Sequence, residues 1–109
     1  MRINLHKLVL DGLSSRFQNM RIKYALKRGK RIGVIVSFRD KIDGKVKLGT
    51  SLCSGLDKFD RTMGVLFALK NSVDINNQDN LNLFLKRVPS SLKKDVYIQF
   101  DRARRYFIF

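Results

Sequence analysis

Two apolar runs separated by a tight-turn signal limit the fold of this chain more than any other feature. Residues 32–38 are rich in β-branched side chains, which strands favour. Asp43-Gly44 is a dipeptide typical of hairpin turns, and residues 46–52 alternate between apolar and other side chains. The pattern predicts an antiparallel β-hairpin whose second strand has one apolar face.

The segment before the hairpin has the periodicity of an amphipathic helix. Its apolar side chains recur at spacings of four, three and four residues: Leu13, Phe17, Met20 and Tyr24. Ser14 or Ser15 can cap such a helix, and Gly29 can end it after about Arg28. We therefore predict a helix between these limits. Residues 2–11 fit either a strand or a short helix.

Two further helices are predicted after the hairpin. Asp57 is a favourable N-cap for a helix over residues 58–72, and Asp60 adds negative charge to its first turn. Asp79 can cap a shorter helix that ends before Pro89. The apolar side chains expected to be buried are Phe59, Met63, Leu66, Phe67 and Leu69 in the first helix and Leu81, Phe84, Leu85 and Val88 in the second.

The C-terminal segment has the composition of β-structure, either two strands in a tight hairpin or one long edge strand. Val96–Phe100 is β-branched and aromatic, and Tyr106–Phe109 is strongly apolar, with a basic polar stretch between them. An apolar strand at this position must be covered by something. Homodimerisation through it is one arrangement that would cover it.

Together these segments predict a single domain over residues 1–109. Its class is α+β, a small antiparallel β-sheet with two to four helices packed mainly on one face. The length of 109 residues matches one domain, and 44% hydrophobic residues with eight Phe suffice for a buried core.

The charge of the chain is distributed unevenly. The net charge is +14, of which residues 1–39 supply +9, with ten Lys and Arg against one Asp. Residues 40–84 are neutral with six of each sign, and residues 85–109 supply +5, with seven against two. Such a surface favours an anionic partner, and nucleic acid is the first candidate because neutralised phosphates release counterions.

The candidate nucleic-acid-binding residues fall into three groups. The first is an acid-free cluster of Arg21, Lys23, Lys27, Arg28, Lys30 and Arg31. The second lies among aromatic residues near the C-terminus and consists of Arg102, Arg104, Arg105 and Tyr106. The third is the lysine pair of the predicted hairpin, Lys45 and Lys47. Tyr97 or Tyr106 is a candidate stacking platform for bases.

Each group also has a purely structural explanation. A run of like charges can be a solvated helix face that keeps the protein soluble. Lysines beside a turn can protect an edge strand from pairing with another chain. The aromatic residues near the C-terminus can belong to the core.

Catalytic and metal-binding patterns are weak in this sequence. His6 is the single histidine, and Cys53 follows an apolar strand, where a small core residue is expected. Asp57 and Asp60 lie three residues apart, but helix capping explains both carboxylates. No Gly-rich phosphate loop or zinc spacing is present. We therefore predict a non-enzymatic protein without a cofactor or metal.

The sequence also predicts a location. A single Cys excludes an internal disulfide and favours a reducing compartment. No apolar stretch has the length of a membrane span, and the N-terminal run Leu8-Val9-Leu10 is too short for a signal peptide. A soluble cytoplasmic protein without membrane contact is expected.

One segment resembles a strand-to-helix unit found in many small accessory proteins of tailed bacteriophages. The shared features are a Gly-containing strand that ends in Cys, an Asp-x-Phe turn, and a helix with Gly and Ala four residues apart, here Gly49, Cys53, Asp57, Phe59, Gly64 and Ala68. The resemblance implies a phage-encoded, non-enzymatic accessory protein that acts in the host cytoplasm on nucleic acid or host machinery. Proteins of this class include inhibitors of host toxin endoribonucleases, some of which work together with RNA.

Two functions from different classes are therefore predicted. The first is binding of nucleic acid, RNA in preference to DNA, through phosphate contacts. The alternative is an antitoxin-like inhibitor whose cationic surface docks on an acidic host protein or on a host nuclease that already holds RNA. In the first case binding weakens steeply as the salt concentration rises. In the second case a partner protein from host lysate stays bound after RNase treatment.

Overall fold

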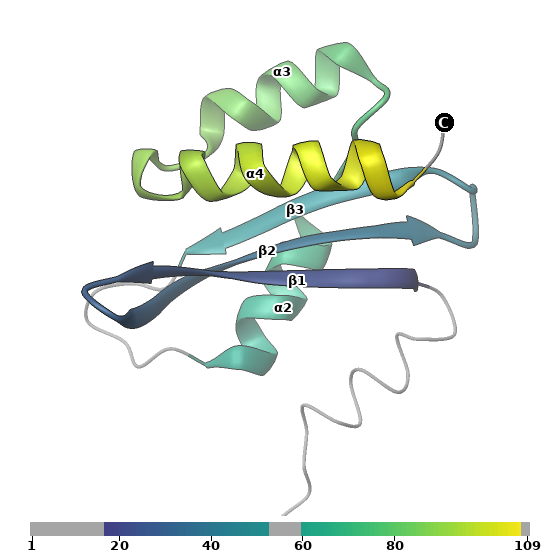
Figure 1. The fold of residues 1–109 in the computed structure, drawn as a ribbon. Helices are drawn as coiled ribbons and strands as arrows, with labels where there is room; N and C mark the ends of the chain where they lie inside the picture. Colours follow the sequence, from purple (N-terminus) through teal and green to yellow (C-terminus); the bar gives the residue numbers. More distant parts are fainter. Residues whose placement is uncertain (1–16, 53–59, 108–109) are drawn as a thin grey trace, which may run out of the picture.

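The computed structural model describes residues 17–52 and 60–107. The elements in chain order are β1 (Phe17–Lys27), β2 (Lys30–Asp40), β3 (Val46–Leu52), α2 (Arg61–Lys70), β4 (Val73–Asp74), α3 (Gln78–Arg87) and α4 (Ser90–Tyr106). The strands form one antiparallel sheet in the order β1-β2-β3-β4 (Figure 1). Helices α3 and α4 cover one face of this sheet and α2 covers the other. The predicted α+β class is confirmed.

The predicted hairpin is present as β2 and β3. Their antiparallel register pairs Arg39 with Val46. The Asp40 amide donates a hydrogen bond to the Lys45 carbonyl at 2.9 Å, which closes the connecting loop. Gly44 in this loop has a φ of +70°, a conformation that favours glycine. Asp43-Gly44 therefore located the turn correctly.

Each face of the sheet has its own core. The core between the sheet and helices α3 and α4 includes Ala25, Ile35, Leu48, Leu81, Phe84, Leu92 and Val96. The core between the sheet and α2 includes Val34, Val36, Phe38, Val65, Ala68 and Leu69. Strand β2 is buried on both faces, which explains its nearly continuous apolar sequence.

Helix α2 lies directly on the backbone of β3. A Cβ atom on Gly49 would overlap the Ala68 carbonyl, so only glycine permits this approach. Met63 and Phe67 were predicted to be buried, but both side chains are about half exposed. The reason is that smaller residues face the sheet, namely Val65, Ala68 and Leu69.

Strand β1 occupies the segment for which a helix was predicted, so that prediction is wrong. Its pairing with β2 is irregular around Asn19, which has a φ of +53°. An extra residue in a strand shifts the alternation of side chains by one position. The side chains that pack on the α2 side are therefore Phe17, Met20, Ile22 and Tyr24. Three of these have the spacing of a helix stripe, although they belong to a bulged strand.

Helix α4 replaces the strand predicted at Val96–Phe100, so that prediction is wrong. Of the second predicted strand, Tyr106 ends α4, Phe107 is not in a strand, and residues 108–109 lie outside the described residues. The buried side chains of α4 recur at helical spacing: Leu92, Val96, Gln99 and Ala103. Packing of this stripe on the sheet overrides the strand preference of the β-branched and aromatic residues. Phe107 is buried against the same core without a second chain, whereas Tyr106 beside it is 47% exposed. The strand expected to mediate dimerisation is absent from the described residues.

The N-caps of two helices also differ from the predicted ones. Asp60 caps α2 and accepts a hydrogen bond from the amide three residues later, where Asp57 was predicted. Asn77 caps α3 in the same way, and the predicted cap Asp79 lies in the first turn. Acidic and amide side chains compete for these positions with similar preference, so sequence alone locates a cap only to within a few residues.

Some predictions concern residues 1–16, 53–59 and 108–109, which lie outside the described residues. They include the element at residues 2–11, the caps Ser14 and Ser15, and the placement of His6, Cys53, Asp57, Phe59 and Phe109. These predictions remain as stated.

Candidate nucleic-acid interface

The two basic ends of the sequence meet where α4 crosses β1. Helix α4 lies on one face of the sheet and runs in the direction opposite to β1 (Figure 1). Arg21 and Lys23 from β1 and Arg102 and Arg105 from α4 line one open groove of about 660 Å³. We call it the β1–α4 groove. None of the described residues that line it is acidic.

A buried glutamine holds α4 at this distance from the sheet. Gln99 is 3% exposed, and its side-chain amide donates to the Ser37 hydroxyl at 3.1 Å and to the Arg21 carbonyl at 3.3 Å. Both acceptors belong to the sheet, so the amide links three elements across the floor of the groove. A buried amide whose hydrogen bonds are satisfied fixes one packing geometry. Gln99 is thus a positioning residue for the arginines that follow it on α4.

Arg21 stacks on an exposed aromatic ring at one end of the groove. Its guanidinium carbon lies 4.2 Å from the centroid of the Tyr106 ring, and Tyr106 is 47% exposed. The ring also makes an edge contact with the buried Phe107 at 5.0 Å between centroids. Packing from both sides holds the tyrosine in place while leaving part of it open to solvent.

Lys23 is the one cation of the groove that forms an ion pair among the described residues. Its ammonium group lies 3.4 Å from the carboxylate of Asp95 on α4, and both side chains are about one-quarter exposed. Arg102 and Arg105 are exposed and form no ion pair within residues 17–52 and 60–107. Arg105 donates to the Asp101 carbonyl at 3.4 Å. The groove therefore keeps most of its positive charge.

The remaining residues of the first basic cluster lie at the far end of β1. Lys27, Arg28 and Lys30 are exposed around a two-residue turn, in which Arg28 and Gly29 have φ values of +53° and +78°. Arg31 instead stacks over Tyr24 at 4.2 Å, a ring that packs against the α2 side of the sheet. The cluster predicted as one unit is therefore divided between the groove, the hairpin tip and the opposite face.

Lys45 and Lys47 are occupied by carboxylates. Lys47 lies 2.9 Å from buried Asp40 and 3.0 Å from Asp43. Lys45 lies 3.8 Å from Asp74. These contacts neutralise the lysines locally, and neither residue lines the β1–α4 groove. The structural explanation, lysines that stabilise and protect the hairpin, fits these two residues.

The same contacts shift two pKa values. The backbone amide of Lys45 donates to Asp43, and together with the hydrogen bond from Lys47 it holds the pKa of the Asp43 carboxyl below its ordinary value of 3.8. Burial lowers the pKa of Lys47, but its hydrogen bonds to Asp40 and Asp43 outweigh this effect and leave the pKa above 10.5. Both groups are therefore charged at neutral pH.

Two other predicted residues lie on α4 but not in the groove. Arg104 is exposed, with its guanidinium 5.7 Å from the Phe100 ring. Tyr97 is 55% exposed and does not line the groove. Of the two tyrosines predicted as stacking platforms, the structure brings Tyr106 to the cationic groove.

Sequence reasoning missed the groups that organise the groove. Gln99 lies in the middle of the apolar run at residues 96–100, where a polar residue is a signal for a buried hydrogen bond. Asp95 was counted only as a negative charge. The helical spacing of the apolar residues from Leu92 to Ala103 would have placed both residues on a helix. This spacing was not recognised because the segment was predicted as a strand.

Comparisons with known proteins give no family for this chain. No protein-family model matches it, and searches of the curated proteins and of the solved structures find no match either. In the part of the chain that the structure describes, no three His, Cys, Asp or Glu side chains are grouped as a metal site requires. Nor is any helix in those residues long and apolar enough to cross a membrane.

Proposed function

We propose that the protein binds single-stranded nucleic acid in the β1–α4 groove, RNA in preference to DNA, and acts without catalysis. The observation that carries the proposal is the convergence of Arg21, Lys23, Arg102 and Arg105 on one groove whose described lining has no acidic residue. Like charges held close together destabilise a fold, so their convergence needs a compensating partner. The phosphates of a nucleic acid supply that compensation.

The aromatic part of the groove supports a single-stranded partner. Tyr106 exposes part of its ring beside the Arg21 guanidinium, and planar groups of this kind stack with unpaired bases. Arginine also offers its donors in a rigid planar fork that matches phosphate oxygens, whereas the three donors of a lysine ammonium rotate freely. The preference for RNA rests on this combination, which is common where splayed bases of single strands are bound.

The turn between β1 and β2 extends the proposed path of the nucleic-acid strand. Residues 21–27 of an extended strand span roughly 20 Å. Lys27, Arg28 and Lys30 then lie beyond the groove along β1, exposed to solvent. In this proposal the groove fixes one part of the strand, and the turn adds phosphate contacts with the neighbouring nucleotides. We place this activity in the cytoplasm; the resemblance to phage accessory proteins is compatible with it and remains a prediction.

The experiment that tests the proposal compares two double variants of equal charge. Arg102→Ala with Arg105→Ala removes two cations from the groove, whereas Lys41→Ala with Lys86→Ala removes two exposed cations elsewhere. Affinity for a labelled single-stranded RNA of about 16 nucleotides, within the usual site size of such proteins, is measured by anisotropy at several salt concentrations.

The groove variant should bind more weakly, and the slope of log affinity against log salt should become shallower by roughly 1.4, since each phosphate contact contributes about 0.7. The control variant should keep the slope of the unmodified protein. Equal effects of the two variants, or no salt-sensitive binding by the nuclease-treated protein, would refute the proposal. A DNA strand of the same sequence tests the RNA preference.

A further inference from the structure

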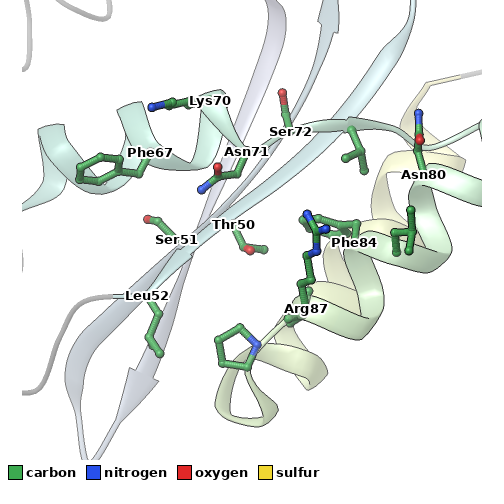
Figure 2. Close-up of a pocket in the computed structure, with 14 residues that line it drawn as sticks. Thr50, Ser51, Leu52, Phe67, Lys70, Asn71, Ser72, Asn80, Phe84 and Arg87 are labelled. Atoms are coloured by element: carbon green, nitrogen blue, oxygen red, sulfur yellow. The ribbon is translucent and has the colours of Figure 1, made fainter.

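Another groove among the described residues lies at the edge of the sheet opposite to β1. It has a volume of about 680 Å³ and lies between the end of α2, strand β3, and the segment from α3 to the start of α4 (Figure 2). Thr50, Ser51 and Leu52 of β3 lie along it. We call it the β3-edge groove.

The edge of β3 in this groove lacks a neighbouring strand among the described residues. Strand β4 is two residues long and pairs only with Lys47 and Leu48. β3 continues through Leu52, so its last four residues pass the end of β4. A strand edge of this kind presents backbone donors and acceptors to any extended peptide that reaches it.

The hydrogen bonds on either side of β3 show which groups face the open edge. The Lys45 carbonyl accepts from Asp40 on the β2 side, and the Val46 carbonyl accepts from Ile75 on the β4 side. Backbone groups of successive residues in an antiparallel strand point to opposite sides. The amides and carbonyls of Thr50 and Leu52 therefore point away from β2. Thr50 is only 8% exposed and Leu52 is 45% exposed, so Leu52 is the accessible part of this edge.

Apolar side chains and cations flank this edge. Leu52, Phe67 and Leu83 are 45%, 49% and 53% exposed, and all three line the groove. Lys70 from α2 and Arg87 from α3 also line it, and no acidic residue does so within the described part of the chain. Figure 2 shows these two cations on opposite walls, with β3 between them.

We propose that the β3-edge groove binds an extended acidic segment of a partner protein, which pairs with the end of β3 at Leu52. The open backbone groups select an extended conformation, and the half-exposed apolar residues accept alternate side chains. The two cations select carboxylates at positions that face the walls. This site is separate from the β1–α4 groove, because the two share no lining residue.

The test selects binders from a yeast-displayed library of random nine-residue peptides, with the full-length, nuclease-treated protein as bait. Enriched peptides should carry net negative charge and β-branched or aromatic residues at alternate positions. One enriched peptide is then synthesised, and its affinity is measured against five variants. Failure to enrich any peptide above background would overturn the proposal.

Two matched pairs separate the contributions. Leu52→Pro removes one outward-pointing amide together with the side chain, while Leu52→Ala removes the side chain alone; the proline variant should bind about tenfold more weakly than the alanine variant, the upper range for one hydrogen bond. Lys70→Glu with Arg87→Glu should abolish binding, and Lys41→Glu with Lys86→Glu should leave at least partial binding. Equal affinities within either pair would contradict the proposal.

Arg102→Ala with Arg105→Ala keeps the two proposals distinguishable. This variant should lose RNA affinity and retain peptide affinity. Loss of peptide affinity would mean that acidic peptides bind the β1–α4 groove, which overturns the inference. Sedimentation of the free protein is measured as well: self-association that Leu52→Pro abolishes would identify a second copy of the chain as the occupant, against the proposal.

Discussion

The β1–α4 groove and the turn at residues 40–47 are both rich in cations, yet the protein uses these cations differently. At the turn, Lys47 lies between Asp40 and Asp43, and Lys45 faces Asp74. In the groove, Lys23 alone has an ion-pair partner among the described residues, and Arg21 lies on an aromatic ring. Whether a cation is available for binding therefore depends on whether folding brings a carboxylate next to it. A count of charged residues in the sequence does not show this.

The largest expected effect concerns the turn and is one of stability. Asp40→Ala removes a buried carboxylate that lies 2.9 Å from Lys47 and accepts the Ile42 amide at 3.0 Å. Asp43 still pairs with Lys47 in this variant, so the cost is that of two hydrogen bonds to a charged, buried acceptor, and unfolding in urea should show a loss of about 3 kcal/mol. RNA affinity of the folded variant should stay unchanged. Weaker binding by folded protein would mean that the turn takes part in the interface.

The next effect concerns the groove and is one of affinity. Tyr106→Ala removes the ring beneath Arg21 and should weaken RNA binding by about 1–3 kcal/mol, the usual contribution of one stacked base. Tyr106→Phe keeps the ring and serves as the control, with affinity close to that of the unmodified protein. Anisotropy titration measures both. Similar losses for the two variants would assign the effect to the hydroxyl and remove stacking from the account.

A smaller difference is expected between two single lysines. Lys23→Ala in the groove should make the salt dependence of RNA affinity shallower by about 0.7, if it releases one phosphate contact. Lys45→Ala at the turn should leave the slope unchanged, although its side chain is more exposed than that of Lys23. Equal slopes for the two variants would show that Asp95 already neutralises Lys23.

The smallest effect is the pH dependence of the turn. The pKa of Asp43 is lowered in the folded state, so its contribution is present above about pH 3.8 and is lost as the pH falls through the lowered value. The pKa of Lys47 is raised, so its contribution is present below pH 10.5 and is lost as the pH rises through the raised value. Urea unfolding at a series of pH values should show that Asp43→Asn loses less of its free energy of unfolding at low pH than the unmodified protein does. The same loss at low pH in both proteins would contradict a stabilising role of the Asp43 carboxylate.

The sequence predicted the central hairpin because its two signals agree. Apolar alternation and Asp43-Gly44 each indicate two strands joined by a turn, and no competing pattern is present. The two elements whose type was predicted wrongly, β1 and α4, each have a local pattern with two explanations. The bulge at Asn19 gave β1 the spacing of a helix, and the aromatic residues of α4 concealed the stripe from Leu92 to Ala103. Burial depends on tertiary partners, which local patterns do not contain.

The candidate site was predictable in composition but not in arrangement. Arginine, lysine and tyrosine were identified as its residue types, and both basic ends were expected to take part. The strand prediction for the C-terminal segment gave no means of placing Arg102 and Arg105 beside Arg21. Their meeting depends on α4 running opposite to β1 and on Gln99, whose amide binds the Arg21 carbonyl. The neutralisation of Lys45 and Lys47 likewise depends on the register of β2, β3 and β4.

Photocrosslinking of a bound single-stranded RNA that contains 4-thiouridine, with the attached peptides mapped by mass spectrometry, tests the central claim most directly. The account predicts crosslinks at Tyr106 and in the segments around Arg21 and Arg102, and their loss in Arg102→Ala with Arg105→Ala. Crosslinks confined to the turn at residues 40–47 or to the β3-edge groove would contradict it.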